Sequence, residues 1–91
     1  MQSLPETVSA YRKTPEFSAE TTPKALLNAH KTKAGSWALI RVIEGEVEYY
    51  IVEPDDEFLV LNPDQNGVIE PEVLHRVRPR PGARFFVEFY R

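Results

Sequence analysis

The sequence predicts an all-β fold, built either as a single barrel or as two stacked sheets. Apolar and polar residues alternate with period two through most of the chain from residue 37 onward, as they do in half-buried strands. Turn signals separate these runs at intervals of about 8–12 residues, a spacing typical of sandwiches and barrels. Because the chain has only 91 residues, we expect one domain over residues 1–91, with residues 1–12 as a candidate N-terminal arm.

One segment before residue 37 has an ambiguous pattern. Residues 23–29 begin with a proline and contain good helix formers, which favours a helix. The hairpin-rich remainder of the chain favours a strand instead, and we expect a strand here. No segment after residue 30 has a convincing helical pattern.

Residues 37–43 and 46–52 carry the strongest strand signal, and a two-residue turn ending in Gly45 separates them. Two such runs around a glycine-containing turn predict a hairpin, in which the glycine takes a positive φ. In that pairing Arg41 lies opposite Glu48 as a solvated ion pair. Alternation also predicts one shared core face, which consists of Ala38, Ile40, Val42, Val47, Tyr49 and Ile51.

The rest of the chain alternates between short strands and turns. Segments rich in proline, aspartate and Asn-Gly predict the turns, because these residues favour tight-turn conformations. The predicted strands are residues 58–61, 68–70, 74–79 and 84–91, and the predicted turns are residues 54–57, 63–67 and 79–82.

Composition and charge exclude several classes of function. The chain has no cysteine, which excludes disulfides, zinc ribbons, iron–sulfur clusters and thiol nucleophiles. The net charge of −3 argues against a nucleic-acid partner. No apolar run reaches the roughly 20 residues of a membrane helix, and the N-terminus does not resemble a signal peptide. We therefore expect a cytoplasmic protein without a membrane partner.

The chain has two histidines, and each lies beside a turn. His30 comes before a glycine-containing turn, and His75 opens a strand that follows Pro71. Cupins carry two motifs, an H-x-H pair followed by a hairpin glycine, and a glycine and a proline that precede a histidine. Asn28-x-His30 resembles the first motif, and Gly67, Pro71 and His75 resemble the second.

A closer resemblance is to the TehB/YeaR-like family, a group of small cupin-like domains associated by name with tellurite resistance. The resemblance covers roughly residues 11–91. The matching segments are Thr14-Pro15-x-Phe17, Pro23 with His30, Thr32-Lys33-x-Gly35-x-Trp37, Val42-x-x-Gly45, Glu70-Pro71-x-x-x-His75-Arg76-Val77 and Phe89-Tyr90.

This resemblance implies a cupin-like barrel or double-sheet jelly roll in which His30 and His75 point into the interior and face each other across it. Cupins hold a divalent metal there, so we expect Zn, Fe or Ni as the cofactor. Asn28, beside the histidines, is the third candidate ligand. Family members often carry an acid at this position. A carboxylate would complete a set of two histidines and one carboxylate, whereas a neutral amide is a poorer ligand.

The leading hypothesis for function is a small cupin-like domain that binds a divalent metal or small ligand in the barrel interior, in a stress or tellurite-resistance context. One alternative is a metal-dependent enzyme that acts on a small molecule, and another is a metal-free sensing or protein-interaction module. We expect a homodimer, because so short a chain would gain core area by dimerising. Some family members resemble an extension of a methyltransferase. This sequence has no S-adenosylmethionine motif, and we assign it no such activity.

Several other polar and aromatic residues have simple structural explanations. Glu88 is a further candidate ligand, but alternation points it away from the apolar face of the last strand. Glu70 precedes a proline and suits a turn. Aromatic residues in a small barrel usually belong to its core, and we expect this of Trp37, Tyr49 and Phe58. We expect one solvated strand face from the basic stretch of Arg76, Arg78, Arg80 and Arg84.

Overall fold

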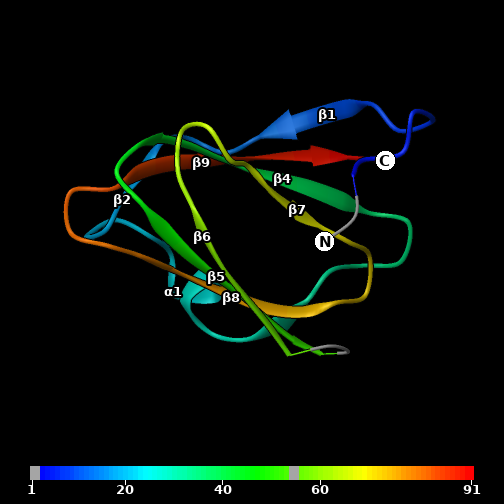
Figure 1. Cartoon of the computed structure of the whole chain (residues 1–91). Helices are drawn as coiled ribbons and strands as arrows, with labels where there is room; N and C mark the ends of the chain where they lie inside the picture. The colour runs from blue at the N-terminus through cyan, green and yellow to red at the C-terminus, as the bar shows by residue number, and fades with distance from the viewer. Residues whose placement is uncertain (1–2, 54–55) are drawn as a thin grey trace.

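The computed structural model describes residues 3–53 and 56–91, which form two antiparallel sheets that face each other (Figure 1). The first sheet has the strand order β1-β9-β4-β7, with β2 also paired to β9, and the second has the order β3-β8-β5-β6. The strands are β1 (Ala10–Lys13), β2 (Phe17–Ser18), β3 (His30–Lys31), β4 (Trp37–Glu44), β5 (Val47–Glu53), β6 (Glu57–Leu61), β7 (Gly67–Ile69), β8 (Leu74–Pro79) and β9 (Arg84–Tyr90).

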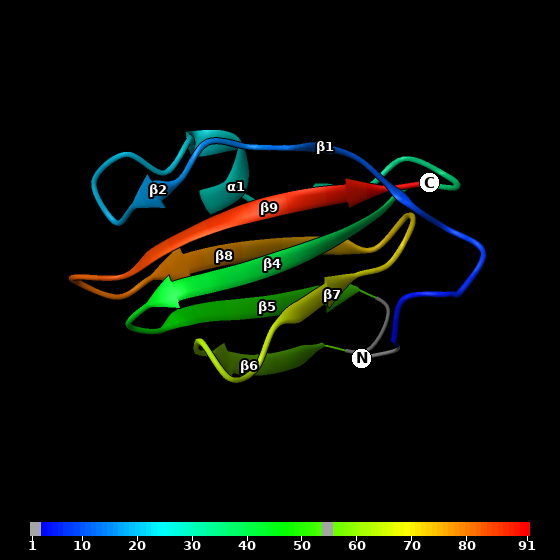
Figure 2. The same ribbon diagram turned by 90° about the horizontal axis from the view of Figure 1, so that it is seen from above.

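The two sheets lie over one another as separate layers (Figure 2). In the part of the chain that the structure describes, no strand of one sheet pairs with a strand of the other. The prediction of an all-β fold is therefore confirmed, and the two-sheet form is the one found. The prediction of a single closed barrel is wrong, because closure needs a continuous hydrogen-bonded ladder around the molecule.

The turn at Gly45 carries the chain from the first sheet to the second. Strand β4 pairs with β7 and β9, whereas β5 pairs with β6 and β8, so the predicted hairpin between residues 37–43 and 46–52 is wrong. Gly45 does adopt a positive φ, of 77°. A Cβ at this position would lie 2.9 Å from the Cα of Ala83, so the crossing also depends on a glycine for space.

The predicted core face is confirmed even though the predicted pairing is wrong. All six of its residues are buried, and they face one another from the two sheets instead of lying side by side in one. The alternation of apolar and polar residues indicates which face of a strand is buried, but it does not identify the neighbouring strand. The predicted ion pair between Arg41 and Glu48 is accordingly wrong. Arg41 pairs with Glu88 of β9, and Glu48 pairs with Arg80.

Tyr49 and Phe85 are the largest side chains fully buried between the sheets. The Tyr49 hydroxyl donates a hydrogen bond of 3.1 Å to the backbone carbonyl of Val68 on β7, which links the second sheet to the first. Phe17 packs its ring edge-on against Phe85 with centroids 5.7 Å apart, which holds β2 on the edge of β9. The core is thus formed by inward-facing residues of both layers.

The ambiguous segment contains the helix α1 (Lys24–Leu27), so the expectation of a strand over residues 23–29 is wrong. Pro23 precedes the helix and Asn28 ends it with an extended backbone. Leu26 packs against the core, which explains why the good helix formers prevail over the surrounding strands. Within the described residues, no helix is long and apolar enough to cross a membrane.

Most other predicted elements are confirmed. Strands β6, β7, β8 and β9 overlap the predicted strands, and Asn62 and Gln65 exchange backbone hydrogen bonds around the next predicted turn. The first two residues of the predicted turn over 54–57 lie outside the described residues.

Candidate functional site

A cavity of about 280 Å³ opens between the sheets at the end of the molecule where β4 begins and β9 ends. Its apolar and aromatic walls come from α1 and the first sheet, and include Tyr11, Leu26, Ala38, Ile69, Val87 and Phe89. Its polar lining comes mainly from β3, β8 and the segment after β3. We call this cavity and its rim the pocket end.

His30 and His75 are cross-strand neighbours in the second sheet, because β3 pairs with β8 in the register that places one opposite the other. Their ring centroids are 4.3 Å apart and the rings are inclined by 56°. Both side chains line the cavity. His75 is 2% exposed, whereas His30 is half-buried at its mouth. The two histidines therefore lie side by side on one sheet, and not across the interior from each other.

Each histidine is oriented by a backbone carbonyl two residues earlier. His30 Nδ1 lies 3.1 Å from the carbonyl oxygen of Asn28, and His75 Nδ1 lies 2.9 Å from that of Val73. A carbonyl only accepts, so Nδ1 must donate in both bonds. In the neutral ring Nε2 then remains as a hydrogen-bond acceptor.

His75 is held in its neutral form. Burial lowers its pKa below 6.5, and the nearby His30 lowers it further, while the bond to Val73 acts in the opposite direction. No carboxylate lines the cavity within the described residues. A buried imidazole without an acidic partner is therefore uncharged near pH 7 and offers an acceptor to any group that enters.

Asn28 does not join the histidines through its side chain. It is exposed at the end of α1, does not line the cavity, and serves His30 only through its backbone carbonyl. Across residues 3–53 and 56–91, no group of three or more His, Cys, Asp or Glu side chains could hold a metal ion. The structure therefore brings together two of the three expected ligands and leaves the third outside.

Thr32 is a polar cavity residue that the sequence did not single out for this role. Its hydroxyl is buried and has no hydrogen-bond partner in the described part of the chain. Its backbone carbonyl accepts a bond of 2.8 Å from the amide of Glu72, which fixes the segment against the turn before β8. A buried hydroxyl without a partner is costly, so an incoming ligand with a polar atom would satisfy it. Threonine is common in strands, and nothing in the local sequence signals this burial.

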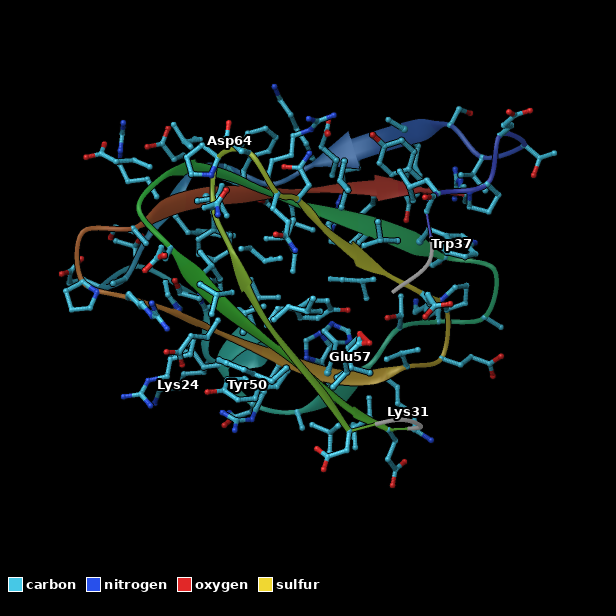
Figure 3. All side chains as sticks on the ribbon, in the orientation of Figure 1. Lys24, Lys31, Trp37, Tyr50, Glu57 and Asp64 are labelled. Atoms are coloured by element: carbon cyan, nitrogen blue, oxygen red, sulfur yellow. The ribbon has the colours of Figure 1, made fainter. Side chains whose placement is uncertain are left out.

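Three cations surround the cavity without an acidic partner. Arg12, Lys31 and Lys33 all line it, and none forms an ion pair with a described residue. Lys31 extends from the same end of the molecule as Trp37 (Figure 3). Arg12 stacks over the Phe89 ring at 4.8 Å. The lining of the cavity therefore contains three cations and no carboxylate among the described residues, while Glu53 and Glu72 lie with Lys31 around a neighbouring hollow. Only the short run of residues 30–33 could have indicated these cations.

The other candidate residues lie elsewhere. Glu88 points away from the core, as alternation predicts, and its carboxylate pairs with Arg41. Tyr49 is in the core as expected, whereas Phe58 is 51% exposed, so the expectation that it is a core residue is wrong. Arg76 stacks over the Tyr50 ring at 4.0 Å on the outer face of the second sheet.

Comparisons with known proteins match this chain to one family. The model of the TehB-like domain matches residues 12–87. Curated relatives include the probable S-adenosyl-L-methionine-dependent methyltransferase TehB of two Haemophilus influenzae strains, 10810 and KW20, each 24% identical over 71 residues. The match covers 74% of this chain and 25% of each TehB. The chain thus corresponds to about a quarter of their length.

Solved structures share the fold. A crystal structure of a protein from E. coli K12 superposes with a TM-score of 0.90 at 22% identity, over 100% of this chain and 97% of that one. The crystal structure of TehB from Haemophilus influenzae superposes with a TM-score of 0.84 at 21% identity, over 93% of this chain and 32% of that one.

These matches correct two expectations. The expected function, a cupin-like domain that binds a divalent metal or small ligand, is wrong, because the curated relatives are named as S-adenosylmethionine-dependent methyltransferases. The expected Zn, Fe or Ni cofactor is wrong for the same reason, and the described residues contain no cluster suited to a metal. The resemblance to TehB is confirmed.

Proposed function

This chain belongs to the TehB-like domain family, and we propose that it is an accessory domain of S-adenosylmethionine-dependent methyl transfer. In this role it supports a transferase domain and does not itself bind the methyl donor. The observation that carries the proposal is the unequal coverage of TehB. Its structure aligns with 93% of this chain, yet the alignment takes up only 32% of TehB. The remaining part of TehB is long enough for a separate catalytic domain.

The described residues fit poorly with a site for the methyl donor. Nucleoside cofactors are often held at a glycine-rich turn between a strand and a helix N-terminus, with an acidic residue on the ribose. The single helix of the described chain, α1, has four residues. The cavity of about 280 Å³ has no acidic residue in its lining.

The jelly-roll form of the fold is part of the same proposal. Two antiparallel sheets with a paired histidine at one end are compatible with a cupin-type jelly roll, which the sequence motifs around His30 and His75 favour. A cytoplasmic location and a homodimer, both expected from the sequence, stay predictions.

A domain replacement in TehB tests the accessory role. Three proteins are compared: Haemophilus influenzae TehB, TehB without the segment that matches this chain, and TehB in which this chain replaces that segment. Release of S-adenosylhomocysteine is measured with the acceptor of the parent enzyme. We expect the deletion to lower the rate by tenfold or more and the replacement to restore a substantial part of it.

Binding of the methyl donor to this chain alone is the matched control. Isothermal titration calorimetry with S-adenosylmethionine should detect no binding to the isolated chain, whereas intact TehB should bind it. Submicromolar binding to the isolated chain would contradict the proposal. So would a folded replacement protein that is no more active than the deletion.

A further inference from the structure

We propose that the pocket end docks an acidic segment of the transferase domain, with one tyrosine of that segment in the cavity and acidic residues on either side of it. This inference rests on the proposed function, because it names the partner of the accessory domain. Three features of the pocket end carry it: the volume and walls of the cavity, the polar atoms in its lining, and three cations that form no ion pair within the described residues.

The cavity has the size and the walls of a site for one side chain. Its volume of about 280 Å³ is small for a drug-sized ligand. The apolar walls include Leu26, Val87 and Phe89, so burial of an aromatic ring against them would remove apolar surface from water. Single aromatic anchors in such pockets supply much of the binding energy of protein interfaces.

The polar atoms inside the cavity favour an aromatic side chain that ends in a hydrogen-bonding group. The Nδ1 atoms of both histidines donate to backbone carbonyls, which leaves their Nε2 atoms as acceptors while the rings are neutral. Thr32 adds a buried hydroxyl without a partner among the described residues. A tyrosine has an apolar ring and a hydroxyl that both donates and accepts, so it can satisfy both kinds of atom, whereas phenylalanine can satisfy neither.

The cations at the rim of the cavity favour acidic residues on either side of the anchoring tyrosine. Arg12, Lys31 and Lys33 line the cavity and form no ion pair within the described chain. Lys31 and Lys33 are exposed, so they can reach carboxylates of a partner without losing internal contacts. Charges arranged in this way mainly steer association and set specificity. The expected partner sequence therefore places aspartate or glutamate next to the tyrosine.

A peptide titration tests the chemistry of the occupant directly. The probe is the blocked peptide acetyl-Glu-Glu-Tyr-Glu-Glu-amide, and its controls replace tyrosine by phenylalanine or all glutamates by glutamine. Binding to the full chain is followed by NMR signals of His30, Thr32 and His75. We expect the probe to shift these signals and to bind about tenfold more tightly than either control, a difference of about 1.4 kcal/mol.

Variants of the chain test which of its residues recognise the peptide. Lys31→Glu/Lys33→Glu should abolish the advantage of the glutamate peptide, whereas the matched double reversal Lys24→Glu/Arg78→Glu, at exposed residues outside the cavity, should retain it. Thr32→Val should weaken binding of the tyrosine peptide and leave that of the phenylalanine peptide unchanged. Equal affinities for all three peptides would overturn the inference. Equal shifts with acetate or phosphate at the same concentration would do so as well, because a simple anion would then suffice.

The same reversals in the TehB replacement protein separate this inference from the proposed function. If the replacement protein is active and Lys31→Glu/Lys33→Glu removes that activity while the Lys24→Glu/Arg78→Glu control keeps it, the docking surface is supported. If both double variants stay active, the accessory role stands and the docking surface is overturned. If the replacement protein is itself inactive although folded, the proposed function fails, and the peptide titration still decides what the cavity binds.

Discussion

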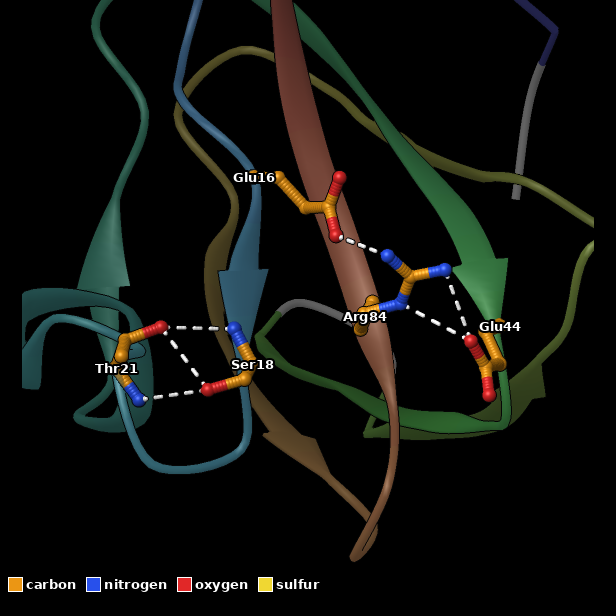
Figure 4. A network of polar contacts seen from close by, with 5 residues as sticks. All are labelled: Glu16, Ser18, Thr21, Glu44 and Arg84. Carbon is orange, nitrogen blue, oxygen red and sulfur yellow. Dashed lines mark hydrogen bonds and ion pairs between the residues drawn. The ribbon is translucent and has the colours of Figure 1, made fainter.

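The two ends of the sandwich differ in whether their basic residues form ion pairs. At the end where β4 leads into β5 and β8 into β9, which we call the paired end, arginines form ion pairs with carboxylates. The guanidinium of Arg84 lies 2.8 Å from a carboxylate oxygen of Glu16 and 2.9 Å from one of Glu44 (Figure 4), and Arg80 pairs with Glu46 and Glu48. At the pocket end three cations have no such partner within the described residues.

This difference bears on which end of the chain is suited to a charged partner. Exposed ion pairs contribute little to stability, because solvent screening and side-chain entropy offset their attraction. Their main effect at the paired end is to neutralise charge locally, so this end presents a weak field to a partner. Unpaired cations around a cavity retain their field and attract acidic groups. The contrast is the basis for placing the proposed docking surface at the pocket end.

Gly45→Ala should have the largest effect, because it strains the paired end. The residue has a φ of 77° and an added Cβ would meet the Cα of Ala83 at 2.9 Å. We expect a loss of about 3 kcal/mol in the free energy of unfolding, from the left-handed backbone and the overlap together. Gly82→Ala is the matched control, since its φ is 84° but nothing lies within 4 Å of its Cβ position. It should cost about 1 kcal/mol. Equal losses in urea titrations would show that the contact with Ala83 is unimportant.

The pH dependence of stability should reveal the neutral histidine of the pocket end. Because the pKa of His75 is lowered in the folded chain, the unfolded chain binds a proton first as the pH falls through about 6.5. The free energy of unfolding should then decrease by up to about 1.4 kcal/mol per pH unit below that point. Its neighbours are His30, with the rings at 4.3 Å, and Tyr49 at 6.2 Å, and no carboxylate of the described chain lines the cavity to oppose the effect.

Urea titrations between pH 5 and 7 measure this slope, and His75→Gln should remove most of it. An NMR titration of the His75 ring, which does not depend on the variant, should give a pKa below 6.5. A slope that persists in the variant, or a ring that titrates above 6.5, would show that burial does not control this histidine.

Thr32→Val should stabilise the free domain. The hydroxyl of Thr32 is buried without a partner among the described residues, and a methyl group of similar size removes its desolvation cost. We expect a gain of about 1 kcal/mol, measured by urea unfolding. At the paired end Thr21→Val is the contrasting change, because the Thr21 hydroxyl accepts a bond of 2.8 Å from the amide of Ser18 and its loss should destabilise. If Thr32→Val also destabilises, the buried hydroxyl is not a net cost to the free domain.

Glu44→Gln should have the smallest effect. It removes one of the two carboxylates that contact Arg84, and both side chains are largely exposed. We expect a change in the urea midpoint close to the error of measurement, and a smaller one still at 1 M salt, where the Debye length is only about 3 Å. A large, salt-resistant loss would show that the ion pairs of the paired end support the fold.

Much of the fold could be predicted from the sequence because its signals are local. Alternation located the buried faces of β4 and β5, and turn residues located most of the boundaries between strands. The wrong predictions mainly concern which strands pair with each other, and this depends on residues far apart in the chain. Two strands separated by a short turn around Gly45 satisfy the same pattern whether they pair with each other or enter different sheets. The prediction of a strand over residues 23–29 is also wrong. A helix of one turn, such as the one that contains Leu26, is too short to show a periodicity.

The candidate site was predicted less completely than the fold. The sequence pointed to His30 and His75, and the structure brings them together. The sequence also suggested Asn28 as a ligand, but its exposed side chain lies outside the cavity. It gave no indication that Thr32 lines the cavity. Nothing local distinguishes a buried threonine hydroxyl from an exposed one, or a lysine that has a carboxylate partner from one that has none.

Local patterns in the sequence established an all-β chain, the buried sides of β4 and β5, and a glycine in the turn between them. These properties follow from side-chain periodicity and backbone sterics, which act within a few residues. The tertiary structure was needed to show which strands pair, that the two histidines are neighbours on one sheet, and that Arg12, Lys31 and Lys33 line a cavity without an ion-pair partner among the described residues. The physical reason is that hydrogen-bonded ladders and ion pairs join residues far apart in the chain, and their choice depends on how the whole core packs.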